Sequence, residues 1–519
     1  MSLSSFRSDS ALALPFGLRP HQIFWLFALF HFLLWVIIPA ATGPNVQLDV
    51  IEGYAWGHEW PMGTYKHPPL QAWILEIFAQ ITNRAVWASY IASQLAIVTA
   101  FWAVWKTGRR ILNEEGALIG VMMLEGVIYF TYTSTEFNPN VLQLPFWALI
   151  GWSYHKAVKE NRLIDWALLG LWAAGGLYTK YSTALLVICL AILTVAHRET
   201  RPRLLSPGPY LAALIMLGLF MPHLHWLVKH DFQPIVYMQD RMNMDAEHLA
   251  QDYLRAPFIL IFGQLVALLP ITLLAMVFIG EQNSSRQRTS DVFDRWFLHT
   301  VTFGPFALTG VMALAIGFKV HDMWGAPFWD FIGLWILYVF KPSLSPGALR
   351  RFAYFWLIVT IATPVIYGGV SVLYPYVTGR GMRIHFAGRH LAENITPYWH
   401  HRFHTKLSYA IGDTWPAGNL AFYTPDRPHV FINHDPTISP WIDINDFHNK
   451  GGVAVWCIRY CASGNNQGRT PDYVQSMPNV EIQQPLLLER HSGANLPEVV
   501  MGWAIVPPQN ASNTDQTTR

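Results

Sequence analysis

The run HQIFWLFALFHFLLWVIIPAA at residues 21–41 is apolar at nearly every position and contains no Asp, Glu, Lys or Arg. A helix needs about 20 such residues to cross the hydrocarbon core of a membrane, where backbone polar groups find partners only within the helix. The run lacks the small-residue cleavage site of a secretory signal, so we interpret it as a retained first span. It predicts an integral membrane protein.

The rest of the chain repeats this pattern. Of its 519 residues, 52% are hydrophobic and only 13% are charged, whereas soluble domains carry about 25% charged residues. We therefore predict a polytopic α-helical membrane protein with about 11 transmembrane helices and a C-terminal α/β domain. The expected spans lie at about 21–41, 87–105, 116–133, 140–157, 164–178, 181–196, 208–228, 256–280, 297–317, 323–340 and 352–375.

The distribution of Lys and Arg predicts the orientation. The loops on the side of the N terminus carry more than twice as many of these residues as the loops on the other side. Cytoplasmic loops are enriched in Lys and Arg, so we expect the N terminus in the cytoplasm of a bacterial inner membrane. An odd number of spans then puts the C-terminal domain in the periplasm.

The composition changes near residue 376, where Gly, Pro and polar residues replace the long apolar runs. We expect a transmembrane domain over 1–375, with its first periplasmic loop at 42–86, and a soluble α/β domain over 376–506. A disordered tail is expected over 507–519, which is rich in Gln, Asn, Ser and Thr. In the soluble domain we expect a helix at 387–400 and short strands at 407–410, 420–423, 429–432 and 453–456.

Cys457 and Cys461 lie four residues apart in this expected periplasmic domain. An oxidising compartment allows a local disulfide between them, and a close pair of free thiols is the equal alternative. The chain contains neither a G-x-G-x-x-G fingerprint nor a P-loop. Nothing in it therefore indicates a nucleotide cofactor or a nucleic-acid partner.

The first periplasmic loop is unusually rich in chemically active side chains. Asp49 and Glu52 are three residues apart, so a short helix over 49–60 places both carboxylates on one face. A carboxylate at the bilayer edge is suited to act as a general base toward an acceptor hydroxyl or amine. The alternative is a pair of hydrated acids on an interfacial helix.

Lys66 and His67 follow in the same loop and precede Pro68-Pro69. Proline fixes φ and restricts the residue before it, so the two side chains are held on a stiff segment. A cation at this depth can bind a phosphate, although a lone lysine beside lipid headgroups is explained equally well by snorkelling.

Further polar residues are expected at the periplasmic ends of the spans. Ionisable groups at membrane depth are costly, so we interpret these residues together as the lining of a polar cavity. For each residue taken alone a structural role is the better explanation, and the cavity is inferred from all of them together. They are Glu136, Asn138, Asn140, Lys180, Tyr181, His223 and His321.

No metal site is predicted. Asp49, Glu52, His58 and His67 offer ligand atoms but lack the spacing of a known motif, and no cofactor is required. A divalent metal remains an alternative.

Several motifs match a known family in order and spacing. They are Asp49, Glu52, Tyr54 and Trp56 in the first loop, HPPL at 67–70, EFNPN at 136–140, LPFW at 144–147, GGLYTKYS at 175–182 and PHLHW at 222–226. With these motifs the chain resembles bacterial members of the dolichyl-phosphate-mannose-protein mannosyltransferase family and, more distantly, the lipid A aminoarabinose transferases. Both belong to the GT-C superfamily of polytopic glycosyltransferases. The segment 386–453 resembles the outer domain of a bacterial subgroup.

The resemblance implies an inverting transfer of a sugar from a polyprenyl-phosphate donor to a lipid, glycan or protein acceptor on the periplasmic side. It implies that Asp49 is the base, that Glu52 is the second acid of the motif, and that the donor phosphate is held by cationic and polar side chains. The implied donor-phosphate contacts are Lys66, His67 and Lys180. From their expected positions at the same face, we also expect Tyr181 at the donor, and Tyr54, Asn138, Asn140, His223 and His321 at the acceptor or cavity.

One departure concerns the mouth of the fourth span. Several relatives carry an aspartate where this chain has Asn138 and Asn140, and Glu136 is the candidate to replace it.

Two other functions compete with this interpretation. A transporter or flippase for lipid-linked sugars typically contains internal repeats and matching broken helices, which this sequence lacks. A non-catalytic scaffold that binds glycans through its outer domain makes the first-loop acids dispensable.

Overall fold

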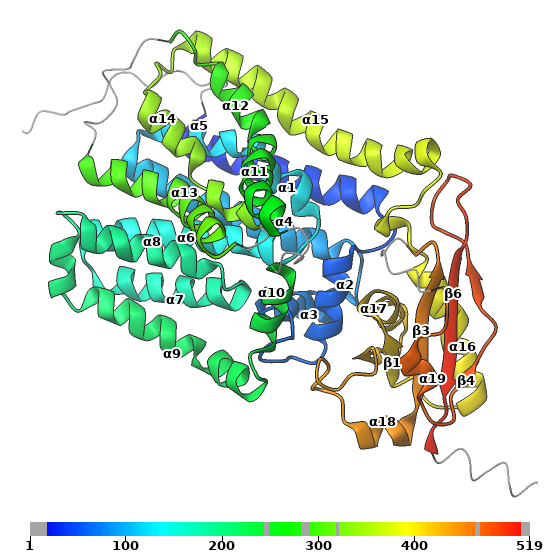
Figure 1. Ribbon diagram of the computed structural model, residues 1–519. Coiled ribbons are helices and arrows are strands. Elements are labelled where there is room, and N and C mark those ends of the chain that lie inside the picture. Colours follow the sequence, from blue (N-terminus) through cyan, green and yellow to red (C-terminus); the bar gives the residue numbers. More distant parts are fainter. Residues whose placement is uncertain (1–17, 243–248, 282–290, 318–320, 462–467, 510–519) are drawn as a thin grey trace, which may run out of the picture.

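The computed structural model describes residues 18–242, 249–281, 291–317, 321–461 and 468–509 (Figure 1). The tail expected over 507–519 lies outside these residues from position 510 onward. In Figure 1 long helices fill one part of the molecule, and a small sheet with its own helices packs against one end of that part.

The described residues of the helical part form fifteen α-helices and a few short turns of other helix types. Those up to the seventh expected span are α1 (Pro20–Thr42), α2 (Leu48–Gly57), α3 (Leu70–Thr82), α4 (Ala88–Ile111), α5 (Glu114–Met122), α6 (Pro139–Glu160), α7 (Leu163–Thr179), α8 (Thr183–Ala196) and α9 (Gly208–Lys229). The others are α10 (Gln233–Met242), α11 (Leu249–Ala267), α12 (Leu269–Met276), α13 (Val292–Met312), α14 (Ile332–Phe340) and α15 (Pro346–Thr378). Short 3-10 helices occupy Met123–Gly126, Ile128–Phe130, Tyr132–Thr135, Arg201–Leu205, Asp322–Trp329 and Arg383–His385, and a π-helical turn occupies Ala313–Gly317.

The chain is a multi-pass membrane protein. Among the described residues, five helices are long and apolar enough to cross a membrane, or up to eight if each bent pair forms one span. Each of the eleven expected segments overlaps a helix or a bent pair, but α7 and α8 have only 17 and 14 residues. The number of eleven spans therefore stays a prediction. The split at Lys180 is confirmed, since α7 ends at Thr179 and α8 begins at Thr183.

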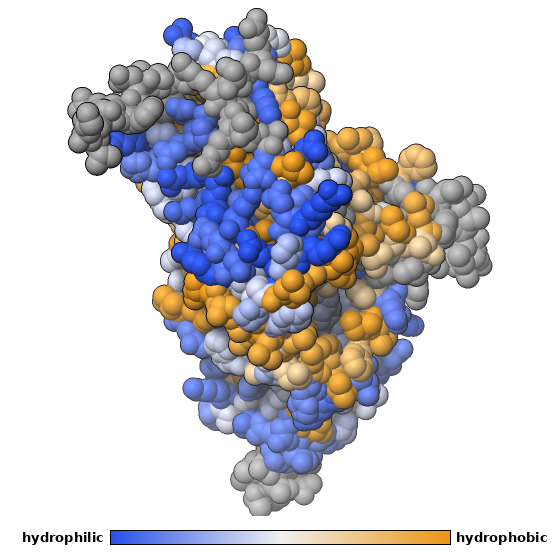
Figure 2. Space-filling model, turned by 90° about the vertical axis from the view of Figure 1, so that its left-hand side faces the viewer, coloured by the Kyte–Doolittle hydropathy of each residue, from blue (hydrophilic) through white to orange (hydrophobic). Residues whose placement is uncertain are grey.

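One end of the helical part is strongly polar. Figure 2 looks onto the end that lies at the left in Figure 1 and shows a hydrophilic patch bordered by hydrophobic surface. Where helices α4, α6 and α7 end or begin, Arg110 pairs with Glu160 at 2.7 Å and Lys156 with Asp165 at 2.8 Å. These loops belong to the set that is rich in Lys and Arg.

The C-terminal domain contains a six-stranded mixed sheet. Strands β1 and β2 are parallel, as are β1 and β3, and β6 is antiparallel to β3, β4 and β5, which gives the order β2-β1-β3-β6-β4 with β5 also on β6. The strands are β1 (Tyr409–Gly412), β2 (His429–Ile432), β3 (Gly452–Arg459), β4 (Glu481–Ile482), β5 (Leu486–Leu488) and β6 (Val499–Val506). The helices are α16 (Gly388–Phe403), α17 (Thr414–Tyr423), α18 (Ile444–Lys450) and α19 (Asp472–Gln475).

The strand expected at 420–423 is wrong, because these residues form the last turns of helix α17. Asp413 caps this helix, because its side chain accepts a hydrogen bond from the backbone N–H of Trp415 over 3.0 Å. Helix α17 lies between the sheet and α2 and is buried along nearly its whole length. A segment buried on all sides has no polar face, so its hydrophobic pattern does not separate a short helix from a strand.

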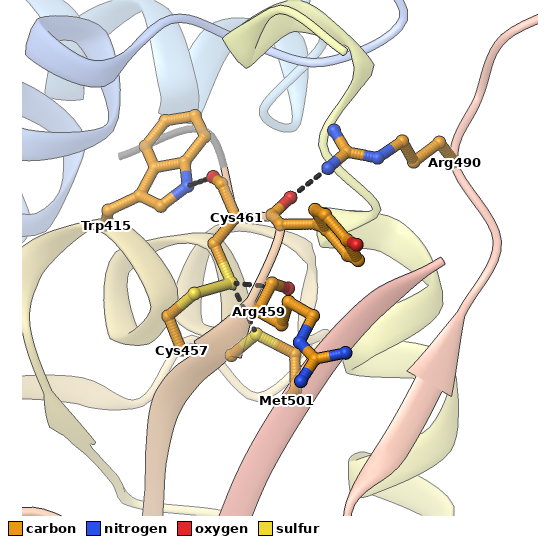
Figure 3. The surroundings of a disulfide bond; sticks show 7 residues. Trp415, Cys457, Arg459, Cys461, Arg490 and Met501 are labelled. Carbon is orange, nitrogen blue, oxygen red and sulfur yellow. Dashed lines mark hydrogen bonds between the residues drawn. A yellow bond between two sulfur atoms is a disulfide. The ribbon is translucent and has the colours of Figure 1, made fainter. Parts of the chain in front are cut away.

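Cys457 and Cys461 are joined by a disulfide bond where β3 leaves its regular register with β6 (Figure 3). The indole N–H of Trp415 donates to the carbonyl of Cys461 over 3.1 Å, and the side chain of Met501 on β6 lies against the bond. Of the two alternatives for these cysteines, the structure therefore contains the bridged one, and the hydrogen bond from Trp415 links this segment to α17.

The C-terminal domain holds the first loop in place. Gly418 of α17 packs directly on Ile51 of α2, since a Cβ added to the glycine would lie 2.5 Å from the Ile51 side chain. Arg84 donates to the carbonyls of Phe422 and Thr424 over 2.8 and 2.7 Å. Helix α2 is consequently fixed between α3 of the helical part and α17 of the C-terminal domain.

Candidate active site

The N-terminal turn of α2 brings three distant side chains together. Glu136 accepts a hydrogen bond from the backbone N–H of Asp49 over 2.9 Å, and the Asn138 amide donates to the Asp49 carboxylate over 3.1 Å. The first backbone N–H groups of a helix have no partner within it, so an acidic side chain is stabilised there. Asp49, Glu136 and Asn138 therefore form one hydrogen-bonded cluster.

Asn138 is oriented by its second role as the cap of α6. Its Oδ1 atom accepts from the backbone N–H groups of Asn140 and Val141, at 2.9 and 3.2 Å. Asn followed by Pro139 at the first helical position is a strong helix-start signal. Because the oxygen is used by the cap, the amide N–H points to Asp49.

Glu52 lies one turn further along α2 and forms an ion pair with Lys66. Burial, and after it the charge of Asp49, raise the pKa of Glu52 to about 7, against the opposing charge of Lys66. Burial also acts against the charged form of Lys66, but the Glu52 carboxylate outweighs it and raises the pKa of the lysine. Three aromatic rings surround the Lys66 ammonium group. Its distances to the ring centres of Trp56, Tyr65 and Tyr237 are 6.0, 5.3 and 5.6 Å.

A turn centred on Thr64 holds Lys66 and His67 in position. The Thr64 hydroxyl accepts from the backbone N–H of His67 over 3.1 Å, and the Thr64 backbone N–H donates to the His67 carbonyl over 3.1 Å. Burial, assisted by Lys180 and Lys66, lowers the pKa of His67 to about 3, so its ring is neutral at physiological pH. His67 can donate a hydrogen bond to a phosphate but carries no charge there.

Lys180 lies between α7 and α8 and reaches the same region. Its ammonium group donates to Asn140 over 2.6 Å and lies 5.6 Å from the centre of the Trp324 ring. Burial lowers the pKa of Lys180 to about 8, against the nearby charge of Asp49. At neutral pH the ammonium form still predominates, and a bound anion would stabilise it further, which makes Lys180 a suitable phosphate contact.

Tyr181 and His223 connect this region to the first loop. The Nδ1 atom of His223 lies 2.5 Å from the carbonyl of Met62, and its Nε2 atom lies 2.8 Å from the Tyr181 hydroxyl. A carbonyl only accepts, so Nδ1 carries the proton, and in the neutral ring Nε2 accepts from Tyr181. The pair locks α9 and the α7–α8 junction onto the loop that carries Lys66.

Two of the expected site residues lie apart from this cluster. Tyr54 is about 140° around α2 from Asp49, where its ring packs on Phe422 of α17 with 4.8 Å between ring centres. His321 packs edge-on against Trp324 at 5.1 Å, and Trp324 in turn lies over Lys180. The Trp324 ring thus links His321 to Lys180.

A cavity of about 330 Å³ adjoins the cluster and is lined by Glu136, Asn138 and Asn140. It also contains two residues that sequence reasoning missed, Gln47 and Arg383. Burial and the charge of Asp49 raise the pKa of Glu136 to about 8, against the lowering effect of Arg383. Arg383 follows the last long helix and carries no local sequence signal, so only the fold brings it to Glu136.

Within the described part of the chain, one group of three side chains is close enough to share a metal ion. It consists of His58, Glu59 and His429 and lies at the other end of α2 from Asp49.

Comparison with known proteins identifies the class of the enzyme. The family model described as dolichyl-phosphate-mannose-protein mannosyltransferase matches residues 66–226. Lipopolysaccharide core galacturonosyltransferase RgtB of Rhizobium johnstonii is 25% identical over 473 residues, which cover 88% of this chain and 90% of the relative. The RgtA galacturonosyltransferase of the same organism is 22% identical over 199 residues, or 38% of this chain and 40% of the relative.

Solved structures share the fold. The crystal structure of ArnT from Cupriavidus metallidurans bound to undecaprenyl phosphate superposes with a TM-score of 0.61, at 12% identity, over 93% of this chain and 98% of that one. Its apo state gives a TM-score of 0.58 at 11% identity over the same shares of the two chains. The protein is a glycosyltransferase, and its fold is that of ArnT. The predicted enzyme class, a glycosyltransferase, is therefore confirmed.

The described geometry gives the enzyme a site with acids and cations side by side. Asp49, Glu52 and Glu136 bring three carboxyl groups to the N-terminal half of α2, and Lys66 and Lys180 supply the cations next to them. The segment matched by the family model includes Lys66, Glu136 and Lys180, whereas Asp49 and Glu52 precede it.

Proposed function

We propose that this GT-C glycosyltransferase transfers a uronic acid, with inversion, from a polyprenyl-phosphate donor to a lipopolysaccharide-type acceptor. The observation that carries the proposal is the cluster of Asp49 with Glu136 and Asn138 beside the cavity that Arg383 also lines. The galacturonosyltransferase relatives support the acidic sugar and the acceptor, and the ArnT structure with undecaprenyl phosphate supports the donor class.

The proposal places the reaction at the periplasmic face of a bacterial inner membrane. Its support is the excess of Lys and Arg in the loops on the side of the N terminus, which predicts that these loops are cytoplasmic. The disulfide between Cys457 and Cys461 supports an oxidising compartment for the C-terminal domain.

Asp49 acts as the general base. Asn138 holds one carboxylate oxygen of Asp49, and the other takes the proton from the acceptor hydroxyl. The acceptor oxygen then forms a bond to the anomeric carbon on the face opposite the phosphate. The bond between that carbon and the phosphate oxygen breaks, and the electron pair leaves with the polyprenyl phosphate.

The leaving phosphate is stabilised by Lys66, His67 and Lys180. Lys180 and Lys66 provide charge, and His67 provides an N–H donor that does not depend on pH near neutrality because its pKa is far below 7. Fixed donors and charges in a site of low dielectric lower the cost of the charge that develops on the leaving group. Tyr181 and His223 hold the loop that carries these contacts.

Arg383 recognises the carboxylate of the transferred sugar from the wall of the cavity, and Gln47 and Asn140 provide neutral hydrogen-bonding groups beside it. Arg pairs with a carboxylate through two parallel hydrogen bonds, which suits a uronic acid better than a neutral sugar.

The test is transfer by the purified, detergent-solubilised enzyme from polyprenyl-phosphate galacturonic acid to lipopolysaccharide isolated from a strain without the enzyme. Asp49→Asn should reduce kcat by about 10²–10⁴, the usual contribution of a general base. Glu114→Gln, which alters an exposed ion pair with Arg109, is the control and should transfer normally. Normal transfer by folded Asp49→Asn would exclude Asp49 as the base.

A second variant tests the sugar. Arg383→Met should raise KM for the uronic-acid donor by about tenfold or more, the usual value of a lost charged hydrogen bond, and change KM for a neutral-hexose donor little. Mass spectrometry of the product gives the mass that is added. An equal effect of Arg383→Met on both donors would contradict the assigned role of Arg383.

A further inference from the structure

The far end of α2 carries a cluster of metal-ligand side chains that the glycosyltransferase site does not use. His58 follows the last residue of α2, Glu59 comes next, and His429 begins strand β2 of the C-terminal domain. One ligand atom from each of the three lies within 4.8 Å of the other two. The rings of His58 and His429 are 5.3 Å apart, and His429 Nδ1 lies 2.8 Å from the Glu59 carboxylate.

We propose that His58, Glu59 and His429 bind a zinc ion that fastens α2 to the C-terminal domain. Two imidazoles and a carboxylate are a common protein ligand set for zinc, with water in the fourth position. Ligand atoms of a tetrahedral site are about 3.3 Å apart when the metal–ligand bonds are about 2.0–2.1 Å. The present spacing therefore requires side-chain adjustments on the order of 1 Å and leaves the backbone in place.

The surroundings favour an ion at this position. The Glu59 side chain is only 7% exposed, so its carboxylate is held in the interface, while His429 is 44% exposed and gives the ion access from solvent. Arg427 lies nearby, but its charge is matched by the buried Glu76 carboxylate at 2.7 Å. A divalent ion at this position would consequently bind the Glu59 carboxylate and lie near Arg427, whose charge is neutralised by Glu76.

The zinc ion would act on structure and not on the reacting atoms. His58 is nine residues from Asp49 along the chain, which corresponds to about 13 Å along the helix axis. The ligands come from both sides of the interface, two from the end of α2 and one from β2. Binding in this geometry stabilises the position of α2, which carries Asp49 and Glu52, whichever sugar and acceptor the enzyme uses.

The chain contains a matched pair that lacks the third ligand. His400 and Asp426 are 2.6 Å apart, with side-chain exposures of 44% and 7%, the same values as for His429 and Glu59. Among the described residues, no further His, Cys, Asp or Glu completes a group of three around them. His400→Ala therefore removes an equally exposed His–carboxylate pair without touching the proposed zinc site.

The experiment measures zinc in the full-length enzyme, purified in detergent with a tag that contains no histidine. The enzyme is stripped with a chelator, incubated with zinc chloride and passed through a desalting column before elemental analysis. We expect about one zinc ion per chain, since the geometry provides one site, and a thermal midpoint that zinc raises. His58→Ala and His429→Ala should each weaken zinc binding by more than about tenfold, because even a change in the second shell costs that much.

His429→Cys is the folding control, since a thiolate is also a zinc ligand and should preserve both the bound ion and the rise in thermal midpoint. His400→Ala should retain the wild-type zinc content. The proposal is overturned if the wild-type enzyme holds no zinc after this treatment, if folded His58→Ala and His429→Ala keep it, or if His400→Ala loses it to the same degree.

Discussion

Three carboxyl groups near the start of α2 have different partners. Asp49 accepts from an asparagine amide, Glu136 accepts from the backbone N–H of Asp49, and Glu52 pairs with Lys66. Burial raises the pKa of both glutamates, to about 7 for Glu52 and about 8 for Glu136. The three carboxyl groups thus differ in their partners, and burial favours the protonated form of the two glutamates.

The Glu52–Lys66 pair should be a major source of local stability. Lys66→Met leaves the Glu52 carboxyl in its buried position without a counter-charge, which should lower the unfolding free energy by about 2–3 kcal/mol, below the 3–5 kcal/mol of fully buried pairs. Thermal unfolding in detergent measures this loss. The double variant Glu52→Gln/Lys66→Met should recover most of it, and no recovery would mean that Lys66 stabilises by packing alone.

Glu136 should make stability depend on pH in a defined direction. Its pKa is raised from 4.5 to about 8, so between these values the unfolded chain has released a proton that the folded chain still binds. The contribution of Glu136 to the free energy of unfolding is therefore fully present below about pH 4.5 and is lost as the pH rises toward 8. Glu136→Gln keeps an acceptor for the Asp49 N–H but does not titrate.

The midpoint of Glu136→Gln relative to wild type should therefore rise as the pH increases from about 5 to 8. The unfolding free energy of Glu136→Gln should exceed that of wild type by about 1–2 kcal/mol at the upper end of this range. This is less than the whole pKa shift would give, because water can enter the adjoining cavity. Thermal unfolding of both proteins across this range is the measurement. A difference that stays constant with pH would contradict the raised pKa.

Helix α2 is placed by close contacts with its neighbours. On one side a Cβ at Gly57 would lie 2.3 Å from the Ala72 carbonyl oxygen of α3, and on the other side Gly418 of α17 packs on Ile51. A backbone oxygen cannot move aside as a side-chain tip can. The separation of α2 and α3 therefore depends on the missing side chain at position 57.

Gly57→Ala should force α2 and α3 apart and lower stability by about 1–3 kcal/mol, as overpacking does in other cores. It should also reduce transfer activity by displacing Glu52 from Lys66. Gly218→Ala in α9 is the matched control, because a Cβ there has nothing within 4 Å and alanine favours a helix. Thermal unfolding of both variants separates a packing effect from a general effect of substituting glycine.

At the scale of the whole molecule, the C-terminal domain packs against α2 and α3 of the helical part. It contacts the helical part through α17 on α2, through the Arg84 hydrogen bonds to the end of α17, and through the ion pair of Arg427 with the buried Glu76 of α3. These contacts carry charge and directional hydrogen bonds, so they set one orientation of the two parts.

Glu76→Gln should loosen this arrangement. The substitution removes the counter-charge of Arg427 within the interface. It should lower the free energy of unfolding by about 3 kcal/mol, the lower end of the range for a broken buried ion pair. Hydrogen exchange of α3 and α17 should increase in this variant. Arg402→Ala, which removes an exposed pair with Glu481 inside the C-terminal domain, should cost less than about 1 kcal/mol and leave exchange of α3 unchanged.

Some parts of this picture can be predicted from local sequence alone. The apolar runs locate the long helices, Asn138 before Pro139 marks the start of α6, and the cluster of Gly175, Gly176 and Lys180 marks the break between α7 and α8. Other parts cannot. The pattern around Leu420 suits a strand as well as a buried helix, and Arg383 has no neighbours in sequence that indicate a site.

The sequence by itself determined the class of the protein and the residue types in its first loop, because apolar length and charge excess act locally along the chain. Only the tertiary structure decided which of these groups meet: Asn138 with Asp49 across 89 positions, Lys66 with Glu52, and His429 with Glu59. The physical reason is that a hydrogen bond or ion pair requires two side chains within a few ångströms. In this protein the packing of α2 between α3 and α17 sets those distances.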